Sequence, residues 1–253
     1  MFAAHSLGSN RKYGARMAHE KPGYLSPKEL KEGIDLCVQN IRDIIQECNL
    51  LLSNGKAARA LALSISAIEE MGKINVLRSI NRLPKNKQKL LSLEWKKYFD
   101  HQYKSSLGFF QTVPDENRTT IESILLSAFL VREQAAMTEE IRQMALYTGY
   151  SLKKKKWHSP RIVDYDSANE YLQKASTAFE RIEKMEELGL FDTDVLELER
   201  EMYKEVYDTI PDEPCEKNTL KRLGNLSKQK AREFYDSLIQ IGKIERSDIC
   251  FLE

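Results

Sequence analysis

Residues 57–73 read A-A-R-A-L-A-L-S-I-S-A-I-E-E-M-G-K, a stretch that is apolar on nearly every side when it is wound into a helix. A helix that is apolar all round normally lies in a protein core. The stretch has 17 residues with Arg59 inside it, which makes it a poor membrane span. We therefore expect a buried central helix over residues 57 to about 81, with the rest of the chain packed around it.

Three charged residues, Glu69, Glu70 and Lys73, stand at the end of this stretch. Glu69 and Lys73 are four residues apart and share one face of a helix, and Glu70 flanks them. Charges on a central helix have two explanations. Either the helix surfaces there and the charges pair with each other, or a buried scaffold holds a polar site. Spacing alone leaves both explanations open.

Helix signals place a long helix directly before the central one. Ser26 and Glu29 form a capping box with Pro27 at the first helical position, and Asn54 and Gly55 end the helix. Its apolar positions form a heptad-like stripe of Leu30, Ile34, Cys37, Ile41, Ile44, Cys48 and Leu51. Because the central helix follows at once, the two should form an antiparallel hairpin. The stripe is equally suited to that hairpin and to a second copy of the chain.

A third helix is expected over residues 85–110, where lysines are interleaved with aromatic residues. Six lysines and two acids lie between residues 85 and 104. Such a mixture can bind nucleic acid, and it also occurs on ordinary amphipathic helices. A fourth helix is expected from about residue 119 to 146. An exposed loop then follows with four consecutive lysines, Lys153, Lys154, Lys155 and Lys156, which would attract phosphates if the loop lay beside a site.

The C-terminal part of the chain differs in composition. A fifth helix is expected over residues 167–188, with Ser167 and Glu170 as its capping box and Gly189 as its end. Residues 180–213 hold 13 acids and four bases, and a last helix, capped by Ser227, should run to about residue 241. No segment alternates like a strand, so the fold class is all-α, an antiparallel helical bundle with additional C-terminal helices. The expected divisions are a poorly ordered N-terminal arm (1–24), a helical domain (25–189) and an acidic C-terminal extension (190–253).

The overall composition is that of a protein with a real hydrophobic core. Hydrophobic residues make up 42% of the chain, and the formal net charge of +1 excludes no class of partner. The four cysteines, Cys37, Cys48, Cys215 and Cys250, show no CxxC pair and no zinc spacing, which favours reduced thiols in the cytoplasm. No stretch is long and apolar enough to span a membrane.

Few side chains are available for chemistry. The sequence has no Gly-rich phosphate loop, no Ser-His-Asp signature and no metal-binding cluster, so we expect neither a metal nor another cofactor. The polar candidates beyond the central helix are His101, Lys104, Arg142 and Tyr147. Cations steady a phosphate while a histidine moves a proton, which suits metal-free phosphodiester chemistry. Each of these residues separately is also compatible with an ordinary surface position.

Three blocks of sequence stand out together. They are N-G-K-A-A-R-A-L-A-L-S-I-S-A-I-E-E-M-G-K at residues 54–73, D-H-Q-Y-K at 100–104 and R-Q-M-A-L-Y at 142–147. In this order and spacing they resemble the AbiV family of abortive-infection proteins. The first block resembles its signature helix, the second its His with a nearby Lys, and the third its Arg leading to Leu-Tyr. The first block is the most specific, and the resemblance covers roughly residues 25–188.

AbiV proteins are grouped with the HEPN superfamily of small helical proteins, which often dimerise and often cleave RNA. The resemblance therefore implies an antiphage effector, a metal-independent HEPN-type ribonuclease that arrests growth or translation on infection. It implies a homodimer, RNA as the substrate, and a phage-encoded activator or a host antitoxin as the controlling partner. Catalytic HEPN nucleases have a histidine four to six residues after the arginine, whereas here Tyr147 follows Arg142. A phenol is a poor base at neutral pH, so either His101 supplies the base or the site only binds.

We expect one polar cleft with the catalytic candidates Glu69, Glu70, Lys73, His101, Arg142 and Tyr147. Lys104 and the four loop lysines are the RNA-binding candidates. The alternative from another class is a non-catalytic helical module that uses the same charges to bind a protein partner or RNA. A third interpretation is structural and makes Glu69 and Lys73 an internal ion pair.

Overall fold

The protein is seen in a computed structural model that describes residues 23–111, 133, 137–151, 155–209 and 217–248. The described elements are α2 (Pro27–Ser53), α3 (Ala57–Arg82), α4 (Gln88–Phe99), α5 (His101–Gln111), a helix over residues 137–146, β1 (Gly149–Ser151), β2 (Lys156–His158), η2 (Pro160–Ile162), α7 (Tyr165–Glu187), α8 (Thr193–Asp208), α9 (Lys217–Gln240) and η3 (Arg246–Asp248). The two strands form one short antiparallel hairpin. The all-α prediction is confirmed.

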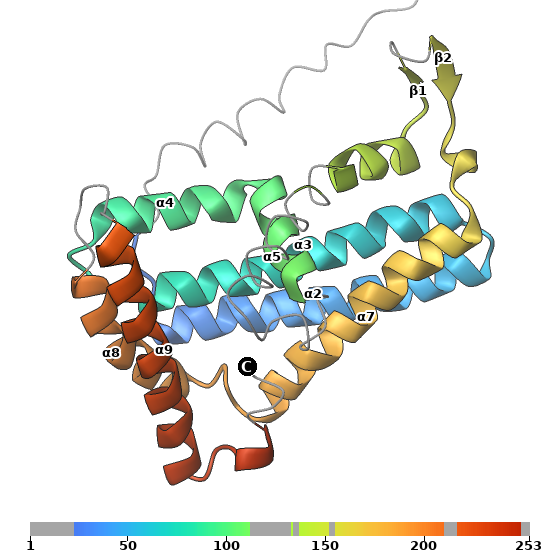
Figure 1. Ribbon diagram of the computed structural model, residues 1–253. Helices are drawn as coiled ribbons and strands as arrows, with labels where there is room; N and C mark the ends of the chain where they lie inside the picture. The colour runs from blue at the N-terminus through green and yellow to red at the C-terminus, as the bar shows by residue number, and fades with distance from the viewer. Residues whose placement is uncertain (1–22, 112–132, 134–136, 152–154, 210–216, 249–253) are drawn as a thin grey trace, which may run out of the picture.

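The long helices α2 and α3 lie side by side and antiparallel, with α7 packed across both of them (Figure 1). The helices α4 and α5 cover another side of α3, and α8 and α9 lie at one end of the bundle (Figure 1). The hairpin β1–β2 projects at the opposite end (Figure 1). The expected hairpin of the first two helices is therefore present, and α3 is its most central member.

Local signals form α2 as expected. The Ser26 hydroxyl accepts a hydrogen bond from the Glu29 amide at 3.2 Å, and the Glu29 carboxylate accepts one from the Ser26 amide at 2.7 Å. The helix ends at Ser53, and Gly55 then adopts φ +69°, a left-handed conformation that costs glycine little. The heptad-like stripe is largely buried within the chain itself, with Leu30, Ile34, Cys37, Ile41 and Cys48 all in the core.

Helix α3 is buried over its first turns as well as its last, which confirms the prediction for the central stretch. Its core residues include Ala60, Leu61, Ile65, Ile68, Met71, Val76, Leu77 and Ile80. This helix contacts α2, α4, α5, α7 and α8. An element in contact with so many others is a rigid support for any side chain that it presents.

Several predicted boundaries were wrong. The helix expected over residues 85–110 is two helices that meet at Asp100, because the Asp100 carboxylate accepts from the Tyr103 amide at 3.0 Å and starts a new helix. The cap of α7 is Asp164, which accepts from the Ser167 amide at 2.7 Å, so the box predicted at Ser167 and Glu170 is absent. Helix α9 begins at Lys217, so Ser227 lies inside it.

The lysine-rich segment expected as a loop is partly a β-hairpin. Lys155 sits at its turn with φ +49°, and Lys156 begins β2. Strands of three residues are too short to show alternation in a sequence. The side chains of Lys153 and Lys154 lie outside the described residues.

Helix α8 is fixed to α3 by a buried ion cluster. The Glu199 carboxylate accepts hydrogen bonds from Arg78 at 2.6 Å and from Arg82 at 2.7 Å, and Asn81 donates to it at 3.2 Å. Leu196 of the same helix lies in the main core. A smaller core of Leu190, Val195, Phe234, Leu238 and Ile244 joins α8 to α9. The division predicted at residue 189 stays a prediction.

Candidate functional site

The site is positioned by an unusually close crossing of α5 over α3. A β-carbon built on Gly72 would lie 2.0 Å from the carbonyl oxygen of Lys104, and one on Gly108 would lie 1.9 Å from that of Ile68. Real β-carbons do not approach other atoms so closely, so only glycine fits at both positions. The two backbones therefore touch, and the first turns of α5 lie against the charged middle of α3.

Glu69 is the centre of the resulting cluster. It is buried, yet it keeps three polar neighbours. Its Oε2 lies 2.9 Å from His101 Nδ1, its Oε1 accepts from the Ser105 hydroxyl at 3.2 Å, and Arg142 Nε lies 4.0 Å from Oε1. A buried carboxylate needs such partners because burial without them disfavours its charge. Glu69 is thus an anchor that orients His101 and Ser105 at the start of α5.

His101 combines a fixed ring nitrogen with an accessible one. It is the first residue of α5, and its side chain is 58% exposed. When Nδ1 donates its proton to the Glu69 carboxylate, Nε2 carries the free lone pair of the neutral ring. A carboxylate that holds one nitrogen sets both the tautomer and the direction of the other. The arrangement can therefore accept a proton from a group that binds at the surface.

Arg142 lies on the other side of Glu69 and is held by its own helix. Its Nε and Nη2 donate to one Glu139 oxygen at 3.0 and 2.7 Å. Burial acts to raise the pKa of Glu139, but hydrogen bonds from Gln143 and Arg142 outweigh it and lower that pKa below its usual value. The ionised Glu139 keeps the guanidinium beside Glu69. Arg142 thus contributes a positioned positive charge next to the histidine–carboxylate pair.

A second ion pair of the cluster is formed within α3, next to Glu69. Lys73 pairs with Glu70, so the internal ion pair that spacing suggested between Glu69 and Lys73 is replaced by this one. The Lys73 ammonium also lies 6.0 Å from the centre of the Tyr98 ring. Burial and the neighbouring Glu70 raise the pKa of the Cys37 thiol to about 12. Cys37 is therefore a protonated core residue, as expected for a free buried cysteine.

Lys104 is the most unusual member of the cluster because it is only 5% exposed. Burial, and then the charge of Lys73, lower its pKa, while Glu69 and Glu70 act in the opposite direction. Among the described residues its ammonium has no hydrogen-bond partner. Taking most of a lysine side chain out of water without a hydrogen-bond partner for its ammonium costs folding free energy. The structure thus holds one more positive charge behind His101 than packing requires.

The structure brings Glu69 within 2.9 Å of His101 and within 4.0 Å of Arg142, and it places Glu70, Lys73 and Lys104 next to this group. Tyr147 lies beyond the end of the helix over 137–146 and is 60% exposed, and its hydroxyl bonds to none of the described residues. Its predicted role stays a prediction. Sequence reasoning missed Ser105 and Glu139, although their spacing of four from His101 and three from Arg142 was a usable signal.

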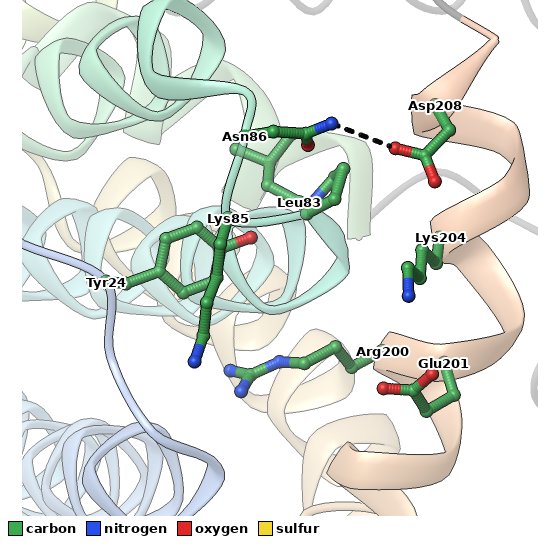
Figure 2. A pocket seen from close by; sticks show the side chains of 9 residues that line it. Tyr24, Leu83, Lys85, Asn86, Arg200, Glu201, Lys204 and Asp208 are labelled. Atoms are coloured by element: carbon green, nitrogen blue, oxygen red, sulfur yellow. Dashed lines mark hydrogen bonds between the residues drawn. The ribbon is translucent and has the colours of Figure 1, made fainter.

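Among the hollows of the described surface, three have charged residues in their lining. The first, of about 400 Å³, lies between the loop after α3 and helix α8, and Figure 2 shows Arg200 extending across it toward Tyr24. Arg200 is held there by the carbonyls of Asn81 and Leu25 at 3.1 and 2.8 Å. This hollow mixes Lys85 and Lys204 with acidic Glu201 and Asp208, so its charges largely offset one another. It lies where α8 meets the bundle, and no histidine lines it.

The second hollow, of about 370 Å³, lies where α3 begins. Its charged lining residues are Lys56, Arg59 and Arg161, and no acid lines it. The third, along α2, mixes acids and bases. No group of three or more His, Cys, Asp or Glu in the described part of the chain is placed to hold a metal ion. None of the described helices has both the length and the apolar character of a membrane span.

Comparison with known proteins gives one clear match. The family model for AbiV, a HEPN-type family, matches residues 29–180, which is more than half of the chain. The matched region contains the whole charged cluster and ends before α8. No significant match was found among curated proteins or solved structures.

Proposed function

The chain belongs to the AbiV family of HEPN-type proteins, and from this premise we propose that it is an abortive-infection effector that cleaves RNA without a metal ion. The contact of Glu69 with His101 at 2.9 Å supports this proposal most directly. It pairs a buried carboxylate with an exposed imidazole, which is the usual arrangement of an oriented general base.

The proposed reaction is transesterification of the RNA strand. Nε2 of neutral His101 takes the proton of a ribose 2′-hydroxyl, and the 2′-oxygen attacks the adjacent phosphorus. The bond from phosphorus to the 5′-oxygen breaks, and that oxygen takes a proton from solvent. The products are a 2′,3′-cyclic phosphate and a 5′-hydroxyl. The imidazolium formed on His101 is stabilised by the Glu69 carboxylate until it returns its proton to solvent.

The cations around the pair have a role in the same step. Negative charge builds up on the phosphate oxygens as the new bond forms, and Arg142 Nε lies 4.0 Å from the Glu69 carboxylate that contacts His101. A guanidinium can bind two phosphate oxygens at once. Lys73 and Lys104 lie beside the same two glutamates, Glu69 and Glu70, and add positive potential without needing to touch the substrate.

Control of the activity is part of the proposal, because a nuclease that acts on its own host must be silent until infection. We therefore assign it a phage-encoded activator or a host antitoxin as partner. The homodimer rests on family membership, since the stripe of α2 that could have supported it is buried against the chain itself. Light scattering at micromolar concentration distinguishes a dimer from a monomer.

The test uses the purified full chain, total RNA and excess chelator. We expect cleavage products with 2′,3′-cyclic phosphate ends, and no cleavage of an oligonucleotide with 2′-deoxyribose at the reacting position. His101→Ala and Glu69→Gln should each slow cleavage by about 10²–10⁴-fold, the usual contribution of general-base catalysis. Arg142→Ala should also slow it. Glu170→Gln, which changes an exposed carboxylate paired with Lys174, is the matched control and should act like wild type.

Growth arrest on phage infection is the cellular readout for the same variants. If His101→Ala and Arg142→Ala remain folded and still cleave RNA and arrest growth like Glu170→Gln, the catalytic assignment is wrong. If the wild-type protein binds RNA or a protein without cleaving any RNA, the non-catalytic interaction module takes its place.

A further inference from the structure

The hollow at the start of α3 is lined by three cations and by no acid. Lys56 and Arg59 come from the first turn of α3 and the residue before it, and Arg161 comes from η2. Within the described part of the chain, none of these three side chains forms an ion pair or a hydrogen bond. All three are exposed, and the cavity they line measures about 370 Å³. Three cations without a counter-charge around one cavity create a binding site for an anion.

The position of this cavity connects it to the proposed active site along two elements. Ala145 and Leu146 also line it, and they follow Arg142 by one turn of the same helix. Arg59 and Glu69 are both on α3, ten residues apart, which corresponds to about 15 Å along the helix axis. A few nucleotides of extended RNA span such a distance. The cavity therefore lies where a strand leaving His101 along α3 would pass.

An exposed aromatic side chain, Trp157, precedes the cavity residue Arg161 by four positions in the sequence. Trp157 belongs to β2, which leads directly into η2 and Arg161, and its side chain is 71% exposed. Lys155 and Lys156 precede it. Proteins bind single-stranded nucleic acid with this combination, in which cations follow the phosphates and an aromatic ring stacks on a base. A double helix would instead cover the ring and gain nothing from it.

We propose that the cavity lined by Lys56, Arg59 and Arg161 binds a backbone phosphate of single-stranded RNA, and that Trp157 stacks on a neighbouring base. This inference rests on the proposed function, because it takes RNA as the substrate of the His101 site. It adds a second contact point several nucleotides from the reacting phosphate. Because phosphate contacts are independent of sequence, this contact would add affinity for the strand without adding sequence preference.

The test measures binding rather than cleavage. The probe is a fluorescently labelled single-stranded oligonucleotide that contains only 2′-deoxyribose or 2′-O-methyl ribose, so His101 cannot cleave it. Anisotropy titrations compare wild type with Arg59→Gln/Arg161→Gln and with Trp157→Ala. The matched control is Lys85→Gln/Lys204→Gln, which removes the same two charges from the other hollow (Figure 2).

We expect the Arg59→Gln/Arg161→Gln variant to bind about tenfold more weakly or worse. The slope of log affinity against log salt should fall by roughly 0.7 for each phosphate that the variant no longer neutralises. Trp157→Ala should lose affinity with no change of slope. The control pair should bind within about twofold of wild type, because general charge attraction alone gives small effects at moderate salt. Wild-type affinity and slope in the cavity variant would overturn the inference, as would equal losses in the control pair.

The two proposals fail separately. Cavity-dependent binding by a wild-type protein that never cleaves RNA would refute the ribonuclease and leave the binding site in place. If the wild-type protein cleaves RNA and the Arg59→Gln/Arg161→Gln variant binds the oligonucleotide normally, only the proposed phosphate site in the cavity is refuted.

Discussion

Gly72 of α3 and Lys104 of α5 are so close that a β-carbon on Gly72 would lie 2.0 Å from the Lys104 carbonyl oxygen. This contact sets the separation of the two helices and therefore the distance from Glu69 to His101. A histidine–carboxylate pair on two different helices is only as well positioned as the helices are. The stability of the crossing and the activity of the site should consequently respond to the same substitution.

We expect Gly72→Ala to push α5 away from α3. The clash is with backbone, which cannot rotate away, so the cost should be at least that of ordinary overpacking, about 1–3 kcal/mol of unfolding free energy. RNA cleavage should fall by more than the stability loss explains, because the Glu69–His101 contact opens. Urea unfolding and the cleavage assay measure the two effects on one preparation.

Gly33→Ala is the matched control for that substitution. Gly33 lies inside α2, where an added β-carbon would meet only Leu77 Cδ1, at an ordinary distance of 3.6 Å. Alanine in place of a helical glycine should stabilise the protein by about 0.5–1 kcal/mol. A Gly72→Ala variant as stable and active as Gly33→Ala would show that the close crossing does not position the site.

Lys104→Met tests the buried ammonium. Burial and the charge of Lys73 lower the pKa of Lys104, so its charged form is less favourable in the folded state than in the unfolded state. As the pH rises, the folded state releases this proton before the unfolded state does, so the free energy of unfolding increases with pH. At neutral pH the lysine is charged in both states, and its charge then destabilises the folded state to the full extent. Methionine keeps the length and the apolar stem without the charge. We expect it to add about 0.5–2 kcal/mol of stability while weakening RNA binding and cleavage.

Thermal unfolding and the anisotropy assay measure the Lys104→Met variant. Lys174→Met is the comparison, because Lys174 is an exposed lysine on α7 paired with Glu170. A loss of stability in Lys104→Met would mean that Glu69 and Glu70 need the Lys104 charge more than burial opposes it.

The buried carboxyl of Glu199 should make the stability of the protein depend on pH in the acidic range. Burial acts to raise the pKa of Glu199, but Arg78 and Arg82 lower it from 4.5 to about 2. A carboxyl with a depressed folded-state pKa stabilises the protein above its unfolded pKa and loses that contribution as the pH falls through the folded value. The difference corresponds to about 3 kcal/mol, lost between about pH 4.5 and 2.

The Glu199→Gln variant should lose about 3–5 kcal/mol at neutral pH, since two arginines then lack their buried partner. Its stability should also fall less than that of wild type on acidification. Urea unfolding followed by circular dichroism at several pH values gives both curves. Parallel curves for the two proteins would contradict the assignment, and Glu170→Gln should track wild type throughout.

Tyr147→Phe asks whether the phenol contributes to the reaction. Its hydroxyl has no hydrogen-bond partner among the described residues, and the ring is 60% exposed. We therefore expect a cleavage rate within about twofold of wild type, since surface substitutions of this kind have small effects. A large drop in the rate at saturating RNA, with binding unchanged, would instead place Tyr147 in contact with the substrate.

The sequence alone determined the helical character of the chain, the hairpin of α2 and α3, and the burial of α3. These features depend on local rules, namely apolar periodicity, the Ser26 capping box and the turn at Gly55, which act within a few residues. The family resemblance additionally selected Glu69, His101 and Arg142. Local rules gave less guidance at Asp100, where a capping residue divides a pattern that otherwise predicts one helix.

Tertiary structure alone decided which of these residues meet. Glu69 and His101 touch because two glycines let α5 approach α3, and neither glycine shows its partner in the sequence. Segment 180–213 is strongly acidic, yet Glu199 within it is buried and paired with Arg78 and Arg82 of α3, a helix that lies far away in the sequence. In the same way, Lys56 and Arg59 at the start of α3 and Arg161 of η2 line one cavity. The energy of a charge depends on what surrounds it in space, and periodicity along a chain contains no information about that surrounding.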